Sequence, residues 1–500
     1  MQRVLDVATI RKSDAETIRG GISGRELMWR AARGVFESYP WQGRVAIVCG
    51  SGNNAGDGFA LALLLTDAKI DCTLFLLSER FSADGAYYYG KCKEIGVKVS
   101  AFSQKEDFSK YTEIVDCIFG TGFRGDAEGL AADAIQAINQ SNKTVISVDI
   151  NSGLNGDNGC SSLCVRSHLT VSVGFYKNGH FLNQAKDVIQ RHINVDIGIG
   201  LHGTCRYLLE ARDVSNILKQ RLQNSHKGDY GYVSILGGCT QYSGAVKLAN
   251  LSCAALRSGC GVAQLIVPQS LAVSVSPYLL ESTLALLPDK DGQMCFDPAA
   301  LDRVLEKQKA LAIGMGWGNS PQNQPILTYI LQNYAIPLVI DADGLNTLAK
   351  TDLLLLKQTK CRVLLTPHAK EMERLSGIPI AQIIQDPIGI AERFAKEYGV
   401  TLLLKGATTV ITDGELTYLV DRGCAGMATA GSGDVLSGIL VGLLGYTECT
   451  PLTAACGAYI AGRAGELAQD DVNPISMTAS DTVSHIAAAI TEIIKENSCC

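Results

Sequence analysis

Short hydrophobic runs alternate with longer segments of mixed polarity through the first half of the chain. The runs occupy residues 44–50, 72–77, 113–120, 144–150, 169–175 and 193–200. Continuous hydrophobic runs of this length are typical of strands buried on both faces, and the segments between them, such as 59–70, fit helices. The pattern predicts a parallel sheet with helices on both faces, an α/β domain of the Rossmann-like three-layer α/β/α type.

A second series of the same kind follows a charged segment at residues 207–221, for which the pattern predicts a helix. Strands are predicted within residues 226–238, 262–268, 310–316, 337–344, 362–368 and 401–406. From Gly431 onward, a region rich in alanine and glycine predicts long helices. The sequence therefore predicts two α/β domains, residues 1–213 and residues 214–500.

Composition narrows the class of protein. A chain of 500 residues is too long for one ordinary core, and 47% hydrophobic with 19% charged residues is a normal globular balance. A net charge of −6 without a cluster of lysine and arginine argues against a nucleic-acid partner. Residues 1–12 form no secretory signal, and the longest uncharged stretch, 258–280, contains two prolines, unlike a membrane span. We expect a soluble, cytoplasmic protein.

The 17 cysteines are scattered and form no C-x-x-C pair, and Cys160 and Cys164 come closest to one. Without a secretory signal, free buried thiols are expected in place of disulfides, and no zinc site is expected. The terminal Cys499 and Cys500 are expected to lie at a frayed end.

Glycine, asparagine and aspartate residues follow three predicted strands of the first half, in SGNNAGDG (51–58), TGFRGD (121–126) and NSGLNGD (151–157). Because the carboxyl ends of parallel strands share one edge of the sheet, these loops are expected to form a common rim. The residues that reach it are Asn53, Asn54, Asp57, Asp116, Gly120, Thr121, Gly122, Asp149 and Ser152. Any one loop could be simple turn chemistry, whereas three at corresponding strand ends favour a ligand site.

The residue types at this rim suit a phosphorylated ligand. Glycine loops that open helices offer backbone amides to phosphate, and Asn54 and Asp116 offer hard oxygens to an alkali or alkaline-earth cation. Asp149 is a candidate general acid or base. The loop SGNNAGDG lacks the G-x-G-x-x-G fingerprint, which disfavours a plain dehydrogenase.

The motifs NNAGDG, VDCIFGTGFRG and VDINSGLNGDNG resemble those of the N-terminal domain of the NAD(P)HX epimerase family, over most of residues 1–200. The resemblance implies substrate contacts at Asn53, Asn54, Ala55, Gly56, Asp57, Gly120, Thr121, Gly122, Phe123, Arg124, Gly125, Asp126 and Asp149. It also implies that Asp149 acts at the reacting ring, and that Asn54, Asp116 and Ser152 hold a potassium ion (K⁺). Asn151 replaces the proline usual in the family, which removes a fixed φ from the turn but no functional group.

The second half contains the loop GMATAGSGDVLSG, residues 426–438, ahead of a hydrophobic helix. Its glycines and the helix N-terminus offer amides that form an anion hole, and the loop has no lysine of a Walker site. Asp434 is placed to accept a proton from a hydroxyl group as that hydroxyl attacks a phosphoryl group. An N-cap aspartate is the alternative, which the density of glycines disfavours.

GSGDVLSG resembles the anion-hole motif of ribokinase-like folds. Together, HKGDYGYVSILGG, YSGAVKLA, GMGWGN, TPHAKEMERL, LKGATTVI and AGMATAGSGD resemble the ADP/ATP-dependent NAD(P)H-hydrate dehydratase family, from about Leu208 to the C-terminus. The resemblance implies a ribokinase-like α/β domain with substrate contacts at Ala245, Gly318, His368, Ala369, Lys370, Glu371, Met372, Glu373, Arg374 and Asp434. The implied nucleotide contacts are Lys405, Gly406, Ala407, Thr408, Thr409, Cys424, Ala425, Gly426, Met427, Ala428, Thr429, Ala430, Gly431, Ser432 and Gly433.

Three details qualify this second resemblance. His368 is expected to contact a ligand and not to transfer a proton. Met315 stands where the family often has proline, and residues 424–427 read CAGM where it usually has NPGM. Both departures lie beside backbone contacts, so we expect them to be tolerated.

The activity that the two resemblances imply is repair of hydrated NADH and NADPH. The first domain would interconvert the R and S epimers, and the second would dehydrate the S form at the expense of ADP, giving AMP and phosphate. Asp434 would take the hydroxyl proton as the phosphoryl group is transferred, with Mg²⁺ bridging the phosphates. ADP as the nucleotide follows from the fused arrangement and not from any single residue.

Two other functions remain open from the sequence. A ribokinase-like small-molecule kinase of the thiazole or hydroxymethylpyrimidine type, fused to a nucleotide-binding module, would share the loop but accumulate a phosphorylated product. A binding module like those of RNA-associated scaffolds would need neither Asp116 nor Asp149, and the net acidity disfavours RNA. A homo-oligomer is expected, because helix-covered sheets with apolar edges often associate.

Overall fold

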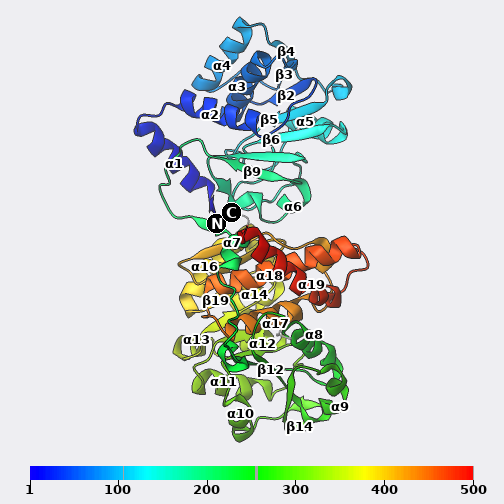
Figure 1. Cartoon of the computed structure of the whole chain (residues 1–500). Coiled ribbons are helices and arrows are strands. Elements are labelled where there is room, and N and C mark those ends of the chain that lie inside the picture. The colour runs from blue at the N-terminus through cyan, green and yellow to red at the C-terminus, as the bar shows by residue number, and fades with distance from the viewer. Residues whose placement is uncertain (105, 254–256, 499–500) are drawn as a thin grey trace. The chain divides into compact units, whose positions relative to one another are not determined.

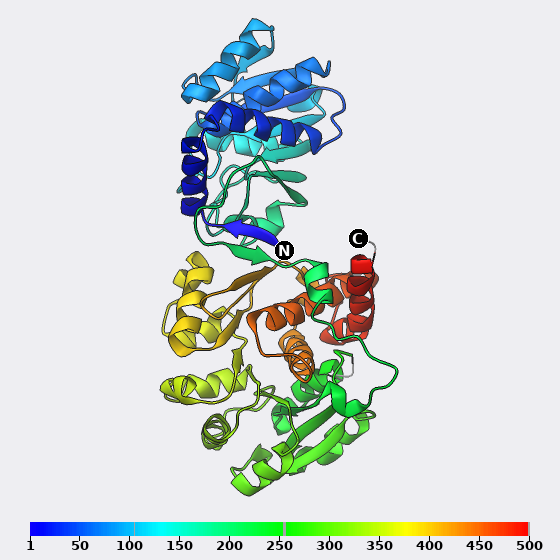
Figure 2. The same cartoon turned by 60° about the vertical axis from the view of Figure 1, so that its left-hand side comes forward.

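The computed structural model describes residues 1–104, 106–253 and 257–498, and the chain divides into two compact units (Figures 1 and 2). The N-terminal domain comprises Arg3–Arg206, and the C-terminal domain comprises Met1–Gln2 and the chain from Tyr207 onward. The boundary between the two domains lies at residue 206, earlier than the expected residue 213, because Tyr207 already pairs with Tyr418 in the C-terminal sheet.

The N-terminal domain is built on a seven-stranded parallel sheet in the order β4-β3-β2-β5-β6-β7-β9. Its strands are β2 (Val45–Cys49), β3 (Cys72–Leu76), β4 (Lys98–Ala101), β5 (Glu113–Cys117), β6 (Thr144–Val148), β7 (Leu169–Val173) and β9 (His192–Val195). All six predicted strands are present; β4 was missed because its short sequence is largely exposed. The strand order reverses between β2 and β5, and ligands of such sheets bind at that point.

Helices cover both faces of this sheet (Figure 1). α2 (Gly24–Glu37), α3 (Asn53–Asp67) and α4 (Ala83–Glu94) share one core with the strands, and α5 (Gly129–Gln140) shares the core of the opposite face. The predicted three-layer arrangement is confirmed. The remaining elements are β1 (Gln2–Leu5), α1 (Val7–Arg19), η1 (Phe108–Lys110), β8 (Tyr176–Lys177), η2 (Asn178–His180) and α6 (Ala185–Val188), and β1 pairs with β8 in parallel.

The C-terminal domain contains a sheet in the order β13-β12-β11-β16-β17-β18-β19-β20-β21-β10. Its strands are β10 (Arg206–Leu208), β11 (Tyr232–Leu236), β12 (Val262–Pro268), β13 (Thr283–Leu287), β16 (Ala310–Ile313), β17 (Leu338–Ile340), β18 (Val363–Leu365), β19 (Thr401–Leu404), β20 (Thr409–Thr412) and β21 (Thr417–Val420). The pairs from β13 to β19 are parallel, and β20 is antiparallel to both of its neighbours. All six predicted strands are present within this sheet.

Three long helices end the chain, as the alanine- and glycine-rich region predicted. α17 (Ser432–Leu444) contacts strands β11, β16 and β17 and helices α8 (Ser243–Cys253), α18 (Pro451–Asp471) and α19 (Ala479–Ser498). Every residue of α17 from Val435 to Leu444 is buried, so this helix forms the centre of the domain core.

Further elements complete the C-terminal domain. They are α7 (Ala211–Ser215), η3 (Lys227–Tyr230), η4 (Thr240–Tyr242), η5 (Gln269–Leu271), α9 (Ala272–Val275), η6 (Ser276–Tyr278), α10 (Pro298–Leu305), α11 (Asn323–Asn333), α12 (Asp343–Leu348), α13 (Leu354–Gln358), α14 (Ala369–Ser376), α15 (Ile380–Gln385), α16 (Pro387–Tyr398), η7 (Ala425–Met427) and the hairpin of β14 (Asp289–Lys290) and β15 (Gln293–Met294).

The prediction of a helix at residues 207–221 is wrong for most of that segment. The segment opens as the end of strand β10, because its first hydrophobic residues, Tyr207 and Leu208, complete the sheet beside β21. Only Ala211–Ser215 is helical.

Ten of the described cysteines are free thiols buried in the protein, as expected. Cys499 and Cys500 lie outside the described residues. Within the described ranges, no helix combines the length and hydropathy that crossing a membrane requires.

Candidate active sites

A cavity of about 780 Å³ opens at the carboxyl ends of β2, β5 and β6 in the N-terminal domain. Its lining includes these predicted substrate contacts: Asn53, Asn54, Asp57, Gly120, Thr121, Gly122, Phe123, Arg124 and Asp149. The three predicted loops thus converge on one hollow, as the strand topology requires.

Four other predicted contacts do not line this cavity. Ala55 and Gly56 are buried within α3, and Gly125 and Asp126 lie in an exposed turn. Conversely, Asp14 of α1 lines the cavity although no sequence motif contains it.

Asp149 is held at this cavity by a buried ion pair. Lys177, whose side chain is 1% exposed, directs its Nζ to Asp149 Oδ1. The same ammonium donates hydrogen bonds to Ser172 Oγ and the Val173 carbonyl, both at 3.1 Å. His180 Nδ1 accepts a hydrogen bond from the backbone N–H of Lys177. The ring proton is therefore on Nε2, which donates to the backbone carbonyl of Asp149 at 2.9 Å. Asp149 therefore faces the ligand as a carboxylate, suited to accept a proton or to stabilise a positive charge.

Two more carboxyl groups lie in this part of the cavity. Burial and then the charge of Asp149 raise the pKa of Asp14 to about 6, with Lys177 opposing. Burial, followed by the same neighbour, raises the pKa of Asp57 well above its ordinary value. We call Asp14, Asp57, Asp149 and Lys177 the acidic cluster. Because the carboxyl groups outnumber the ammonium, burial and their mutual repulsion favour the protonated forms of Asp14 and Asp57 more than in water.

The three implied potassium ligands meet around the backbone of Phe119. Asn54 Nδ2 donates to the Phe119 carbonyl at 2.8 Å, and the Phe119 N–H donates to Ser152 Oγ at 2.8 Å. Asp116 is buried and accepts hydrogen bonds from Ser147 and Ser152, but forms no ion pair within the described residues. Asn54 Oδ1 is likewise buried there without a hydrogen-bond partner. A buried carboxylate without a countercharge, beside an unpartnered amide oxygen, fits a monovalent cation.

Asn151 stands where a proline would have fixed the loop after β6. Its Nδ2 donates to the Val165 carbonyl at 2.8 Å and to Ser167 Oγ at 3.0 Å, and its Oδ1 accepts from Thr170. Hydrogen bonds therefore hold this turn in place of a fixed φ.

In the C-terminal domain, Asp434 lies in the first turn of α17. Gly431 caps this helix at φ +96°, and a Cβ there would lie 2.5 Å from Leu248 Cδ1, so the position requires glycine. The first amides of the helix have no acceptor within it and suit an anion. Burial, and then the charge of Asp341, raises the pKa of Asp434 to about 7, with Lys405 opposing.

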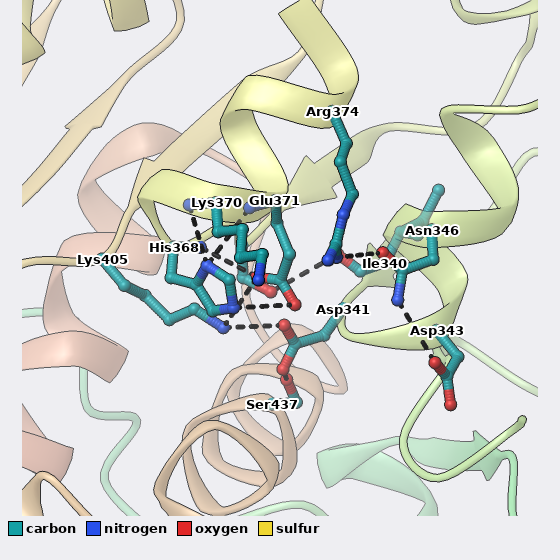
Figure 3. Close-up of polar contacts among 11 residues, drawn as sticks. Ile340, Asp341, Asp343, Asn346, His368, Lys370, Glu371, Arg374, Lys405 and Ser437 are labelled. Carbon is teal, nitrogen blue, oxygen red and sulfur yellow. Dashed lines mark hydrogen bonds and ion pairs between the residues drawn. The ribbon is translucent and has the colours of Figure 1, made fainter. Parts of the chain in front are cut away.

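Lys405 forms the cationic part of this site. Its Nζ lies 2.9 Å from Asp341 Oδ1 and 3.8 Å from Glu371 Oε2 (Figure 3). The other oxygen of Asp341 accepts a hydrogen bond from Ser437 Oγ at 2.7 Å. Burial lowers the pKa of Lys405, but the negative charges of Asp341 and Glu371 raise it by more. The net shift is upward, so the ammonium stays charged. A phosphate near Lys405 would meet a cation whose position is already fixed.

Two predicted substrate contacts, Gly318 and Arg374, are linked by residues that the motifs do not contain. The Gly318 N–H donates to Asp343 Oδ2 at 2.8 Å, and Asn346 Nδ2 donates to Asp343 Oδ1 at 3.2 Å. Arg374 in turn donates to Asn346 Oδ1 at 2.7 Å (Figure 3). The loop after β16 and helix α14 are thus held in register through α12. The predicted contact Ala245 packs beside this loop, against Gly316.

His368 caps helix α14. Its Nδ1 accepts the N–H groups of Lys370 and Glu371, both at 3.1 Å, and its own N–H donates to Glu371 Oε2 at 2.9 Å. The ring is about half exposed, with Nε2 3.6 Å from Glu371 Oε1, so part of the ring is open to a ligand. Of the other predicted residues on α14, Met372 is buried in the core and Glu373 accepts the N–H of Ile380.

The predicted nucleotide contacts occupy two segments. Residues 405–408 form the turn between β19 and β20, Thr409 begins β20, and residues 424–433 run from η7 into α17. The second segment is tied to α18, because the Gly426 N–H donates to Gln469 Oε1 at 3.0 Å and Cys424 Sγ to the Gly465 carbonyl at 3.2 Å.

Substituting Gly431 by alanine is expected to destabilise the C-terminal domain and slow its chemistry. The variant adds left-handed strain of about 1–2 kcal/mol and the contact with Leu248. Gly399, at φ +66° with open space around its Cβ position, provides the control, because alanine there adds strain alone. Denaturant unfolding should show a larger loss for Gly431→Ala than for Gly399→Ala; equal losses would contradict the close packing at Gly431.

Comparison with known proteins gives a consistent result for both domains. The family described as NAD(P)H-hydrate dehydratase matches residues 233–488, and the family described as YjeF-related protein N-terminus matches residues 24–179. A bifunctional NAD(P)H-hydrate repair enzyme of Moorella thermoacetica is 36% identical, across 94% of this chain and 93% of its own length. The enzyme of the same name from Escherichia coli is 30% identical, across 93% and 89%.

A solved structure also matches the C-terminal domain. The ADP/ATP-dependent NAD(P)H-hydrate dehydratase of Bacillus subtilis, co-crystallised with ATP and Mg²⁺, is 26% identical over 58% of this chain and 99% of its own, with a TM-score of 0.50. The ribokinase-like α/β fold expected for the C-terminal domain is thereby confirmed.

Proposed function

Because this chain belongs to the family of bifunctional NAD(P)H-hydrate repair enzymes, we propose that it restores NADH and NADPH from their hydrated forms. The N-terminal domain epimerises the R and S hydrates, and the C-terminal domain dehydrates the S form, converting ADP to AMP and phosphate. One observation carries the dehydratase assignment. Asp434, with a pKa raised to about 7, lies in a helical turn whose amides suit a phosphoryl group.

The hydroxyl group on the hydrated ring is a poor leaving group, whereas phosphate is a good one. Ionised Asp434 takes the hydroxyl proton as the terminal phosphoryl group of ADP passes to the hydroxyl oxygen. The lone pair of the ring nitrogen then expels phosphate, and a proton leaves the neighbouring ring carbon. The double bond that forms restores the reduced nicotinamide.

The residues around Asp434 support the phosphate side of this reaction. Lys405, held by Asp341, and the first amides of α17 would bind the phosphate groups. Mg²⁺, when bound, offsets the negative charge of the phosphates. Asp341 and Asp343 already accept hydrogen bonds from protein donors, so we propose that the phosphates supply most of the ligands for this ion.

The assignment is tested by incubating the protein with hydrated NADH and either ADP or ATP. We expect the absorbance of the reduced nicotinamide to recover, with release of free phosphate. A small-molecule kinase would instead leave a phosphorylated product, and its appearance without recovery of NADH would refute the proposal. Which nucleotide gives the faster recovery tests the expected preference for ADP.

We propose that K⁺ binds at Asn54, Asp116 and Ser152 and supports epimerisation. Replacing K⁺ with the larger tetramethylammonium ion should lower the midpoint temperature of N-terminal domain unfolding and slow conversion of the R hydrate, because Asp116 loses its countercharge. Asp116→Asn should remove the difference between the two salts. An unfolding midpoint that is equal in both salts for the unsubstituted protein would contradict this site.

A further inference from the structure

We infer that Asp14 is a further catalytic residue of the N-terminal site, supplying the proton that the hydroxyl group of the hydrated nicotinamide needs in order to leave. The inference rests on the proposed epimerase function and adds a residue that none of the sequence motifs contains. It follows from the position of Asp14 in the cavity, from the absence of a hydrogen-bond partner for its Oδ1 among the described residues, and from the ion pair between Asp149 and Lys177.

Asp14 comes to the site from α1, far from the three loops in sequence. Its side chain lines the same cavity as Asp57 and Asp149. Its Oδ1 atom is buried and has no hydrogen-bond partner among the residues that the structure describes. Leaving a buried carboxyl oxygen unpartnered disfavours its charged form, so this environment favours a proton on Asp14. The side chain as a whole is only half-buried and lines the cavity, which leaves its less buried part within reach of a ligand.

Asp149 is poorly placed to supply a proton. The Lys177 ammonium is buried against Asp149 Oδ1. Protonation of Asp149 would leave that cation without its countercharge. A carboxylate held in this ion pair can stabilise a cation, but it carries no proton to give to a leaving hydroxyl group. A second group must therefore act as the acid.

The charges around Asp14 let it fill this role. Burial and Asp149 raise the pKa of Asp14 to about 6, so the group can gain and lose a proton near neutral pH. Burial, followed by Asp149, also raises the pKa of Asp57 well above its ordinary value. The other charged side chains that line the cavity are Arg11, Asp84 and Arg124. Asp84 is paired with Arg25 and Arg124 with Asp157, so these partners offset much of their charge at the cavity.

The reaction then divides between two carboxyl groups. Asp14 gives its proton to the hydroxyl oxygen as the carbon–oxygen bond breaks, and the lone pair of the ring nitrogen forms a carbon–nitrogen double bond. Water departs, and the ionised Asp149 stabilises the cationic ring. Water then adds to the opposite face and releases a proton to the water in the cavity, and a proton from that water restores Asp14, so the enzyme is unchanged and the carbon is inverted.

The test uses the full chain, purified R hydrate of NADPH and the variant Asp14→Asn. After the uncatalysed rate is subtracted, we expect the rate of R-to-S conversion to fall by about 100-fold or more. Dehydration of the S hydrate with ADP and the Kd for NADP⁺ at the N-terminal domain should stay unchanged. Glu16→Gln on the same helix, whose side chain pairs with Arg19 outside the cavity lining, is the matched control and should behave like the unsubstituted protein.

The pH profile separates proton transfer from a structural role. Because Asp14 acts in its protonated form, R-to-S conversion by the unsubstituted protein should decrease as pH rises through about 6, and Asp14→Asn should lack this decrease. A variant that keeps the full rate or the same profile would overturn the inference, as would loss of NADP⁺ binding together with the rate. If the unsubstituted protein does not interconvert the hydrates, the proposed epimerase function fails instead.

Discussion

Replacing Asp434 with asparagine will slow dehydration of the S hydrate by about a thousandfold, because asparagine cannot take the hydroxyl proton during phosphoryl transfer. Asparagine keeps the size of the side chain and removes only its charge, so nucleotide binding should persist. The measurement is recovery of reduced-nicotinamide absorbance with ADP and the purified S hydrate. Conversion of R to S, which belongs to the other domain, should be unaffected.

The pH dependence gives a second measure of Asp434. A base acts in its ionised form, and burial raises the pKa of this carboxyl to about 7, so dehydration should accelerate as pH rises through that value. Asp471→Asn, at a largely exposed carboxylate of α18, is the control and should leave both rate and profile intact. Dehydration by Asp434→Asn at the rate of this control would show that the carboxylate has no part in the chemistry.

Replacing Asp149 with asparagine will leave the enzyme able to repair only one epimer. Given a mixture of hydrates and ADP, the variant should consume the S form at the normal rate and then continue only as fast as the R form epimerises without catalysis. The unsubstituted protein should consume both. The two phases can be followed by chromatography that resolves the R and S hydrates.

Asp149→Asn also leaves Lys177 as a buried cation without its partner, which costs about 3–5 kcal/mol. The double variant Asp149→Asn, Lys177→Met removes that charge and should recover much of the lost stability but none of the epimerase activity. Asp187→Asn, on the exposed side of α6, is the control for loss of a carboxylate in the same domain. Normal consumption of the R hydrate by the double variant would refute a role for Asp149.

Much of the fold was predictable, because buried parallel strands carry a strong signal. Runs such as 45–49 and 402–404 are hydrophobic throughout, since helices cover both faces of the sheet. The signal failed at residues 207–221, where the polar and charged positions fit a helix but the partner of Tyr207 is a strand more than two hundred residues away. Pairing with so distant a strand leaves no trace in local periodicity.

The sites were predictable where glycine loops mark the ends of strands, and not elsewhere. Asn54 and Asp434 belong to recognisable glycine-rich motifs. Among the described residues, Asn54 Oδ1 has no hydrogen-bond partner, and Asp434 lies near the charges of Asp341 and Lys405. Asp14, Lys177 and Asp341 lie outside such loops, and each matters because tertiary packing sets it against another charge. A single aspartate on an amphipathic helix looks the same in sequence whether it faces water or an enclosed hollow.

The central position of α17 has a consequence for how the protein responds to its ligands. The turn that carries Asp434 continues directly into the buried segment Val435–Leu444, so it cannot fray without disrupting the interior of the whole domain. Local opening and global denaturation therefore coincide for this element, and a bound nucleotide would protect the entire domain against heat. Cellular supply of the adenine nucleotide would thus govern the lifetime of the enzyme as well as its turnover.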